Sequence, residues 1–144
     1  MKFLIINGPN INMLGIREPE VYGKETYADL CAVIHSACGD DPYEIFQSNH
    51  EGAIVDKIQE AYGRFDAIVI NPAAYTHTSI AIPDALRTVS IPVAEVHISD
   101  IYSREEYRRI SYVFPIAEIQ ISGHGLNGYA EAIHYLKGKH KNAE

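Results

Sequence analysis

The sequence predicts an α/β protein with a flavodoxin-like three-layer sandwich, in which helices cover both faces of a five-stranded parallel sheet. Along the 144 residues, five short apolar segments alternate with five segments whose apolar residues recur at helical spacing. The apolar segments are bounded by Gly, Pro, Asn or Ser and are largely continuous, which is typical of strands buried on both faces of a parallel sheet. Right-handed crossovers would connect them.

The first strand, residues 2–7, leads into the longest irregular segment, the loop 7–23 with the sequence NGPNINMLGIREPEVYG. Its three Gly, two Pro and three Asn predict no regular structure. Connections in such domains usually have about 2 to 6 residues. A loop of seventeen residues that also carries Arg, Glu and Tyr is therefore expected to be a functional lid. A surface loop without chemistry is the alternative.

Three Ser/Thr-x-x-Asp/Glu pairs predict helix starts, because in a capping box each side chain bonds the backbone N–H of the other residue. A further helix begins at Ser79 and carries Pro83 in its first turn, where the missing amide hydrogen is tolerated. The pairs are Thr26–Asp29, Ser48–Glu51 and Ser103–Glu106. The expected helices run over about 26–38, 48–62 and 79–88, over a short stretch from 103, and over 126–137, and the remaining strands over 43–47, 67–71, 93–97 and 117–122.

Composition limits the function classes. The net charge of −7 argues against a nucleic acid partner and requires a local positive site for any anionic substrate. No apolar run approaches about 18 residues and no signal peptide is visible, so we expect a cytoplasmic protein without membrane contact. Cys31 and Cys38 are expected to be reduced core residues. One composition regime indicates a single domain, 1–144, with 138–144 as a frayed polar tail.

Candidate site residues follow from the topology, because ligands of open parallel sheets bind beyond the carboxyl ends of the strands. Only Lys24 among the lysines lies near that edge, at a helix start, which disfavours Schiff-base chemistry. Acid–base work by His and Tyr, with Arg and Asn as electrostatic groups, is the better expectation. The polar residues at that edge are Asn7, Asn12, Arg17, Tyr22, Asn49, His50, Glu51, Asn71, Tyr75, His77, Glu95, His97, Ser99, Arg108 and His124.

Other functions stay open at this point. Gly123–Gly128 satisfies G-x-G-x-x-G, but only 144 − 128 = 16 residues follow it, so we expect no later strand with a ribose-binding acid. A metal-dependent hydrolase built on the His and Glu residues lacks H-x-H or H-E-x-x-H spacing. A flavodoxin-like binding module for a flavin or an anionic nucleotide is a further alternative, although neither alternative accounts for an Arg and a Tyr in one long loop.

Five stretches together resemble the type II 3-dehydroquinate dehydratases of the shikimate and quinate pathways. They cover nearly the whole chain in order: NGPNINMLGIREPEVYG, FQSNHEGAIVDKI, INPAAYTHTSIAIPDAL, PVAEVHISDIYSREEYRRISY and SGHGLNGY. The resemblance implies a hydro-lyase that converts 3-dehydroquinate, a small anionic substrate, to 3-dehydroshikimate through an enolate. It implies no cofactor and no metal. It also implies a homo-oligomer of trimers assembled into a dodecamer.

The resemblance also implies roles for single residues. Tyr22 matches the base that removes the C2 proton, and His97 the acid that protonates the leaving C1 hydroxyl. Arg17 matches the arginine that supports the tyrosinate and the enolate, and Asn12 the residue that places a water near the enolate oxygen. The matches for substrate binding are Asn71 with the backbone of Ile98 and Ser99 at the carboxylate, His77 and Arg108 at the hydroxyls, and Asp84 lent across a subunit boundary.

Physical chemistry agrees with these roles. Tyrosine has an ordinary pKa near 10, so a tyrosine base at neutral pH needs positive charge beside it, and Arg17 lies in the same loop. Glu95, two residues before His97 on a strand, faces the same side and can orient the imidazole as a supporting residue. The chain departs from the family where it has Ala73 instead of Gly, Pro83 instead of Arg and Asp100 instead of Asn. We expect these departures to alter affinity more than activity.

Overall fold

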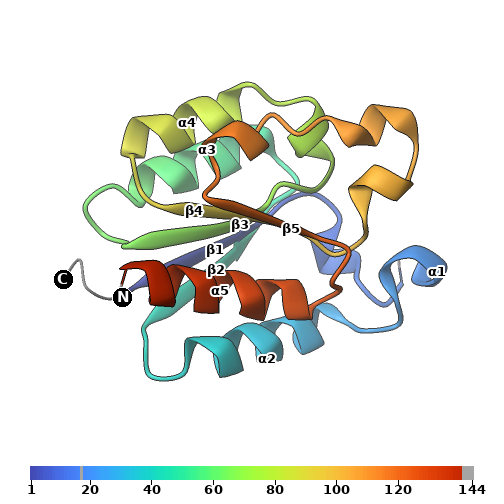
Figure 1. The fold of residues 1–144 in the computed structure, drawn as a ribbon, viewed down its shortest axis with the longest axis horizontal. Coiled ribbons are helices and arrows are strands. Elements are labelled where there is room, and N and C mark those ends of the chain that lie inside the picture. The colour runs from blue at the N-terminus through green and yellow to red at the C-terminus, as the bar shows by residue number, and fades with distance from the viewer. Residues whose placement is uncertain (17, 141–144) are drawn as a thin grey trace.

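The structure, a computed structural model, describes residues 1–16 and 18–140. Its sheet has five parallel strands in the order β2-β1-β3-β4-β5. This order and the helices on both faces confirm the predicted flavodoxin-like sandwich (Figure 1). The strands are β1 (Phe3–Asn7), β2 (Tyr43–Gln47), β3 (Ala67–Asn71), β4 (Val93–His97) and β5 (Ile119–Ser122).

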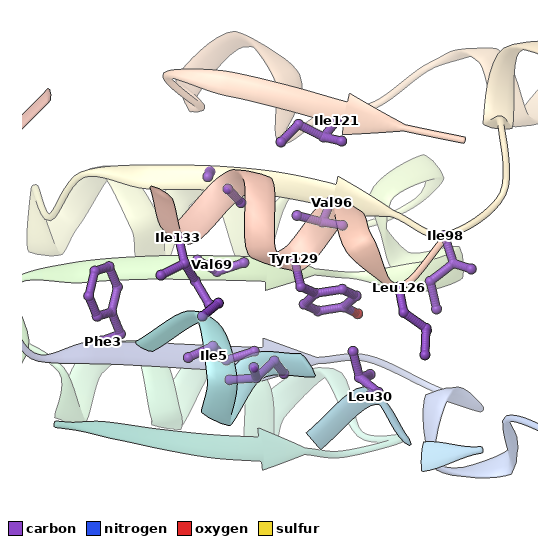
Figure 2. Packing of buried hydrophobic residues seen from close by; sticks show 14 of the residues in the cluster. Phe3, Ile5, Leu30, Val69, Val96, Ile98, Ile121, Leu126, Tyr129 and Ile133 are labelled. Carbon is purple, nitrogen blue, oxygen red and sulfur yellow. The ribbon is translucent and has the colours of Figure 1, made fainter. Parts of the chain in front are cut away.

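Two pairs of helices cover the sheet. Helices α2 (Tyr27–Cys38) and α5 (Asn127–His140) lie on one face, and α3 (Glu51–Glu60) and α4 (Ala81–Val89) on the other (Figure 1). Alternate residues of β1 serve the two cores: Phe3 and Ile5 pack toward α2 and α5, as Figure 2 shows, whereas the next residues along the strand pack toward α3 and α4. The central strands are buried on both faces, which explains their continuous apolar sequences.

The predicted capping boxes have mixed outcomes. The box at Thr26 is confirmed, because its Oγ1 accepts from the Asp29 N–H at 3.2 Å and the Asp29 carboxylate accepts from the Thr26 N–H at 2.8 Å. The box at Ser48 is wrong: its hydroxyl accepts from the His50 N–H at 3.0 Å, and α3 begins only at Glu51. A hydroxyl bond two residues ahead competes with the helix cap.

The helix expected from Ser103 is also wrong. The Ser103 hydroxyl turns back and donates to the Asp100 carbonyl oxygen at 3.0 Å. Instead of one α-helix, the segment forms the short 3₁₀ turns η3 (Ile101–Ser103) and η4 (Glu106–Arg109), followed by η5 (Phe114–Ile116). The first two turns, η3 and η4, form an arm beyond the carboxyl end of β4, whereas η5 lies beside α4 before β5 begins (Figure 1).

The loop 7–23 contains more regular structure than predicted. It holds the 3₁₀ turn η1 (Ile11–Met13) and the short helix α1 (Pro19–Tyr22). Pro19 occupies the first helical position, where its fixed φ favours a turn, and Gly23 ends the helix at a φ of 83°. The segment after β3, also expected to be irregular, forms the 3₁₀ turn η2 (Ala73–His77).

At the other end of the chain, α5 continues to His140, three residues beyond its expected end at Lys137, so residues 138–140 of the expected frayed tail are helical. The His140 ring lies 2.9 Å from the Glu118 carboxylate, and this contact holds the last turn. Residues 141–144 of the predicted tail lie outside the described residues. Within α4, Pro83 lies in the first turn as predicted, and the Ser79 hydroxyl accepts from the Ile82 N–H at 3.0 Å.

A helix that crosses a bilayer needs about 20 predominantly apolar residues. In the part of the chain that the structure describes, no helix combines this length with this apolar character.

Candidate active site

A cavity opens at the carboxyl ends of β1, β3 and β4, where the topology predicts a ligand site. Its volume is about 30 Å³, so the side chains around it must separate to admit a ligand much larger than water. Five lining residues were not predicted: Ile11, Ala73, Ala74, Ile101 and Arg104. The predicted site residues that line it are Tyr22, Asn71, His77, His97, Ile98, Ser99 and Arg108.

Tyr22 ends helix α1 and is 9% exposed. The Nη1 atom of Arg104, in the arm between η3 and η4, donates to its hydroxyl at 2.7 Å and to the Ser99 hydroxyl at 3.3 Å. The guanidinium also lies 5.3 Å from the centre of the Tyr22 ring. A positive charge this close stabilises negative charge on the phenol oxygen, so the contact suits a tyrosine that acts as a base.

Sequence reasoning missed Arg104. The Ser103–Glu106 pattern predicts only a helix start and gives no sign that Arg104 contacts a residue of the first loop. The available signal was the cluster of Arg104, Arg108 and Arg109 beyond the end of a strand in a chain of net charge −7. Such a cluster is the local positive site that an anionic ligand requires.

His97 and Glu95 form a buried pair on β4, with exposed fractions of 4% and 0%. The His97 Nε2 atom lies 2.5 Å from Oε2 of Glu95, as their spacing on the strand predicted. Because Nε2 is held by the carboxylate, Nδ1 is the ring nitrogen left for a ligand.

The Glu95 carboxylate has further partners. Its Oε2 accepts from the hydroxyls of Thr76 at 2.9 Å and Ser111 at 2.6 Å, and its Oε1 accepts from Nε2 of Gln120 at 3.1 Å. Burial alone raises the pKa of the Glu95 carboxyl, but the hydrogen bonds from His97, Ser111 and Thr76 and the charge on His97 outweigh it and lower the pKa below its ordinary value. The carboxylate is therefore held ionised beside the imidazole.

His77 and Arg108 occupy the side of the cavity formed by η2 and the arm. The Nδ1 atom of His77 lies 2.7 Å from the Ile110 carbonyl oxygen, so it carries the hydrogen and donates. Burial lowers the pKa of His77, and the nearby charges of His97 and Arg108 lower it further, against the opposing effect of the Ile110 bond. Arg108 donates from Nε to Glu105 at 2.8 Å. A neutral imidazole and a guanidinium thus face the cavity together.

Asn71, at the end of β3, is 2% exposed. Its Oδ1 accepts from the Ala73 N–H at 3.0 Å, and its Nδ2 donates to the Tyr129 hydroxyl at 2.9 Å. Ala73 itself has a φ of 53°, in the left-handed region where a side chain is strained. The resemblance had flagged this position as one where glycine is usual.

Two predicted residues of the described chain, Asn12 and Asp84, lie away from the cavity. Asn12 lies exposed on η1 and is not among the lining residues. The Asp84 side chain, on α4, is 66% exposed and lies 3.5 Å from Arg87. Arg17 lies outside the described residues. Glu95 does not line the cavity either and reaches it only through His97.

The alternative of a metal-dependent hydrolase would require several ligating side chains close together. Over residues 1–16 and 18–140, no three His, Cys, Asp or Glu side chains gather in a way that could hold a metal ion.

Comparison with known proteins gives a consistent result. The model of the family "Dehydroquinase class II" matches residues 1–137. A 3-dehydroquinate dehydratase of Clostridium acetobutylicum is 55% identical over 140 residues, covering 95% of this chain and 96% of that protein. A catabolic 3-dehydroquinase of Verticillium alfalfae is 56% identical over 136 residues, covering 93% and 91%.

Solved structures with related sequences also have the fold of this chain. A type II dehydroquinase from Butyrivibrio crossotus superposes with a TM-score of 0.93 at 55% identity and covers 95% of this chain and 97% of that one. A 3-dehydroquinate dehydratase-like protein from Bifidobacterium longum gives a TM-score of 0.71 at 27% identity, with coverage of 96% and 97%.

Proposed function

The chain belongs to the dehydroquinase class II family, and from that premise we propose that it is a lyase that dehydrates 3-dehydroquinate to 3-dehydroshikimate by acid–base chemistry of its own side chains. One observation carries the proposal. A tyrosine hydroxyl beside a guanidinium and an imidazole beside a buried carboxylate line the same cavity. Elimination of water from a β-hydroxy ketone needs one base and one acid, and these two pairs can supply them.

Tyr22 is the proposed base. As a phenolate it would take the proton from C2, leaving the electron pair on the enolate that forms at the adjacent carbonyl. Arg104 supports this role because its guanidinium donates to the phenol oxygen at 2.7 Å. Arg17, in the same loop, is proposed to support the phenolate and the enolate together, and Asn12 to place a water beside the enolate oxygen.

His97 is the proposed acid. When the enolate collapses and expels the C1 hydroxyl, the imidazole gives that oxygen a proton, so that water leaves. Glu95 supports this role, because a carboxylate on Nε2 orients the ring and stabilises its cationic form. The proton balance closes when the tyrosine proton returns to His97 between turnovers. No cofactor enters this scheme.

The substrate's own groups find matching partners around the cavity. We propose that Asn71 and the backbone N–H groups of Ile98 and Ser99 bind the carboxylate, and that His77 and Arg108 bind the ring hydroxyls. Arg104 and Arg108 give the cavity local positive charge in a chain of net charge −7. The cavity can therefore bind an anion although the net charge of the chain is negative.

An oligomer explains the one binding residue that lies away from the cavity. Asp84 is 66% exposed on α4, so we propose that it reaches the site of a neighbouring subunit in a trimer, and that trimers assemble into a dodecamer. Size-exclusion chromatography with light scattering measures this directly. A monomer that retains full activity would contradict it.

We also propose that the enzyme acts in the cytoplasm. Cys31 and Cys38 are both free thiols in the structure, as is usual for proteins of a reducing compartment. Fractionation of cells that produce the protein, followed by immunodetection, tests this placement.

The test of function follows the ultraviolet absorbance of the conjugated enone product from 3-dehydroquinate in chelator-treated buffer. We expect turnover, and we expect Tyr22→Phe to lower kcat by about 10²- to 10⁴-fold, the usual contribution of a general base. Tyr107→Phe, which alters an exposed tyrosine of the arm that carries Arg104, is the matched control. Folded enzyme without turnover, or a bound flavin or nucleotide in its place, would refute the proposal.

A further inference from the structure

The segment Ser122–Tyr129, SGHGLNGY, has no part in the chemistry proposed above, although it contains the glycine pattern noted in the sequence. In the structure it joins β5 to α5 and contacts the ends of three other strands. Its backbone and side chains form hydrogen bonds with residues that line the cavity, but the segment itself does not line the cavity. The contacts fall into two groups, one made by the turn at residues 122–125 and one by the Tyr129 hydroxyl.

The turn holds the chain that follows β4. The Gly123 N–H donates to the His97 carbonyl oxygen at 3.2 Å, and the Gly125 N–H to the Ile98 carbonyl oxygen at 3.1 Å. The Ser122 hydroxyl donates to the Ser99 carbonyl oxygen at 3.2 Å. In a trans peptide the N–H points opposite to the C=O. The bonds to the His97 and Ile98 carbonyls therefore also fix the N–H groups of Ile98 and Ser99, and the bond to the Ser99 carbonyl fixes the peptide that follows them.

Glycine at position 123 is required by this arrangement. Its φ is 84°, and a Cβ there would lie 3.0 Å from the Cβ of Asp100. A side chain would therefore be strained in two ways and would push the turn away from the chain after β4.

Tyr129 reaches the ends of two other strands. Its ring is fully buried under α5, and its oxygen points toward the carboxyl ends of the strands (Figure 2). The hydroxyl accepts from Nδ2 of Asn71 at 2.9 Å and donates to Oδ1 of Asn7 at 2.7 Å. Asn7 and Asn71 are register partners on β1 and β3. One phenol thus links the last residues of the two central strands.

The direction of these hydrogen bonds is determined. The Ala73 N–H can only donate, so the atom of Asn71 that faces it at 3.0 Å is Oδ1. Nδ2 of Asn71 then faces Tyr129 and donates, and the phenol must pass its own hydrogen to Asn7. Burial raises the pKa of Tyr129, so the phenol keeps that hydrogen. The second hydrogen on Nδ2 of Asn71 remains for a ligand oxygen.

Glycine at position 128 allows the helix to come close enough. A Cβ there would lie 3.2 Å from Cγ2 of Ile121 and 3.3 Å from Cγ1 of Val96. Any larger residue would lift the first turn of α5 from β4 and β5, and the Tyr129 hydroxyl with it.

We propose that Tyr129 is a positioning residue for the carboxylate of the substrate, acting through Asn71, and that the turn 122–125 positions the backbone donors of the same subsite. This inference rests on the proposed function, in which Asn71, Ile98 and Ser99 bind that carboxylate. The segment SGHGLNGY thereby supports the anion-binding subsite. Its glycines allow the turn to approach the chain after β4 and allow α5 to approach β4 and β5.

The test measures binding and does not depend on turnover. Quinate, the 3-hydroxy analogue of the substrate, and its methyl ester differ only in the charged carboxylate, and calorimetric titration gives the affinity of each. We expect wild-type protein to prefer the acid. In Tyr129→Phe the preference should fall about tenfold, the effect of one hydrogen bond to a charged group, while affinity for the ester changes less than about twofold. With 3-dehydroquinate, KM should rise more than kcat falls.

Controls separate positioning from general damage. Tyr135→Phe removes a hydroxyl from the same helix that contacts Lys139 and should leave the preference unchanged. Ser122→Ala removes the bond to the Ser99 carbonyl and also the bond that the same hydroxyl accepts from the Ile101 N–H at 3.1 Å. It keeps the test decisive if Tyr129→Phe does not fold, and we expect the preference to fall about threefold. Equal weakening of acid and ester in either variant, or no preference in wild type, would overturn the inference. Absence of turnover in wild type would instead refute the proposed function.

Discussion

Arg104 donates a hydrogen bond to the Tyr22 hydroxyl at 2.7 Å although 82 positions separate the two residues in the sequence. The contact joins helix α1 of the first loop to the arm that follows β4. Neither segment alone forms the tyrosine site. Arg104 can therefore support the proposed base only while the loop and the arm lie against each other.

Replacing Arg104 with Ala should lower kcat on 3-dehydroquinate by about 10²- to 10³-fold, because the phenolate would lose a charged donor in a partly buried site. Arg104→Lys should recover part of the loss, since an ammonium keeps the charge but not the fork geometry. Steady-state kinetics measure both. Arg109→Ala, which alters an exposed arginine outside the cavity, serves as the control, and a near-normal kcat in Arg104→Ala would contradict the assignment.

Glu95→Gln should lower kcat by about 10²-fold with a smaller change in KM, because the neutral amide cannot stabilise the imidazolium form of His97. The substitution keeps the shape of the side chain and its contact with Thr76 and Ser111 hydroxyls. Gln120→Leu, which removes the partner on the other carboxylate oxygen, should cost less. If Glu95→Gln changes KM alone, the carboxylate does not serve the acid.

Stability should decrease as the pH falls, in two steps. The folded protein lowers the pKa of His77 below 6.5. The contribution of neutral His77 to the free energy of unfolding is therefore complete above about pH 6.5 and is lost as the pH falls toward the pKa of the folded state. The folded protein also lowers the pKa of Glu95 below 4.5, so a second loss begins below about pH 4.5. Each proton taken up steepens the decline by at most about 1.4 kcal/mol per pH unit.

Urea unfolding between pH 7 and pH 4 measures this decline. His77→Asn, whose amide can still donate to the Ile110 carbonyl, should flatten the step that begins below about pH 6.5 while leaving the acidic step in place. A variant with the same pH dependence as wild type would show that His77 does not contribute.

Ala73→Gly should stabilise the protein by about 0.5 to 1 kcal/mol. The left-handed φ of 53° costs an alanine roughly 1 to 2 kcal/mol, which a glycine would not pay. The greater conformational freedom of glycine in the unfolded chain offsets part of this stabilisation. Thermal unfolding should show a rise in Tm of about 2 to 4 °C per kcal/mol. Ala74→Gly, one residue later, is the control and should destabilise; a lower Tm for Ala73→Gly would contradict the strain argument.

The strands were predictable because each is a short apolar run with a clear end. Every predicted strand overlaps an observed one, and 43–47, 67–71 and 93–97 agree at both ends. Helix starts were less predictable, since Ser-x-x-Glu also occurs where the serine bonds elsewhere, as Ser103 does with the Asp100 carbonyl. Local patterns do not distinguish these two uses of a hydroxyl.

The site was predictable where topology alone determines it. His97 and Asn71 end parallel strands, so they had to meet at one edge of the sheet. Arg104 was not predictable, because its contact with Tyr22 depends on how two irregular segments fold over that edge. Asp84 came from the family resemblance alone and Asn12 from both topology and resemblance, and within the described chain neither lines the cavity.

The pairing of Asn7 with Asn71 across β1 and β3 has a consequence for engineering the chain. Insertions of one or two residues within the loop after β1 should leave the sheet intact, since only that loop changes length. One residue inserted inside β1 would instead turn Asn7 to the opposite face of the sheet. The Tyr129 hydroxyl would then lose its acceptor. The shifted residues of β1 that pack in one core would also turn toward the other core. Chimaeras between relatives should therefore cross over in loops, never within these two strands.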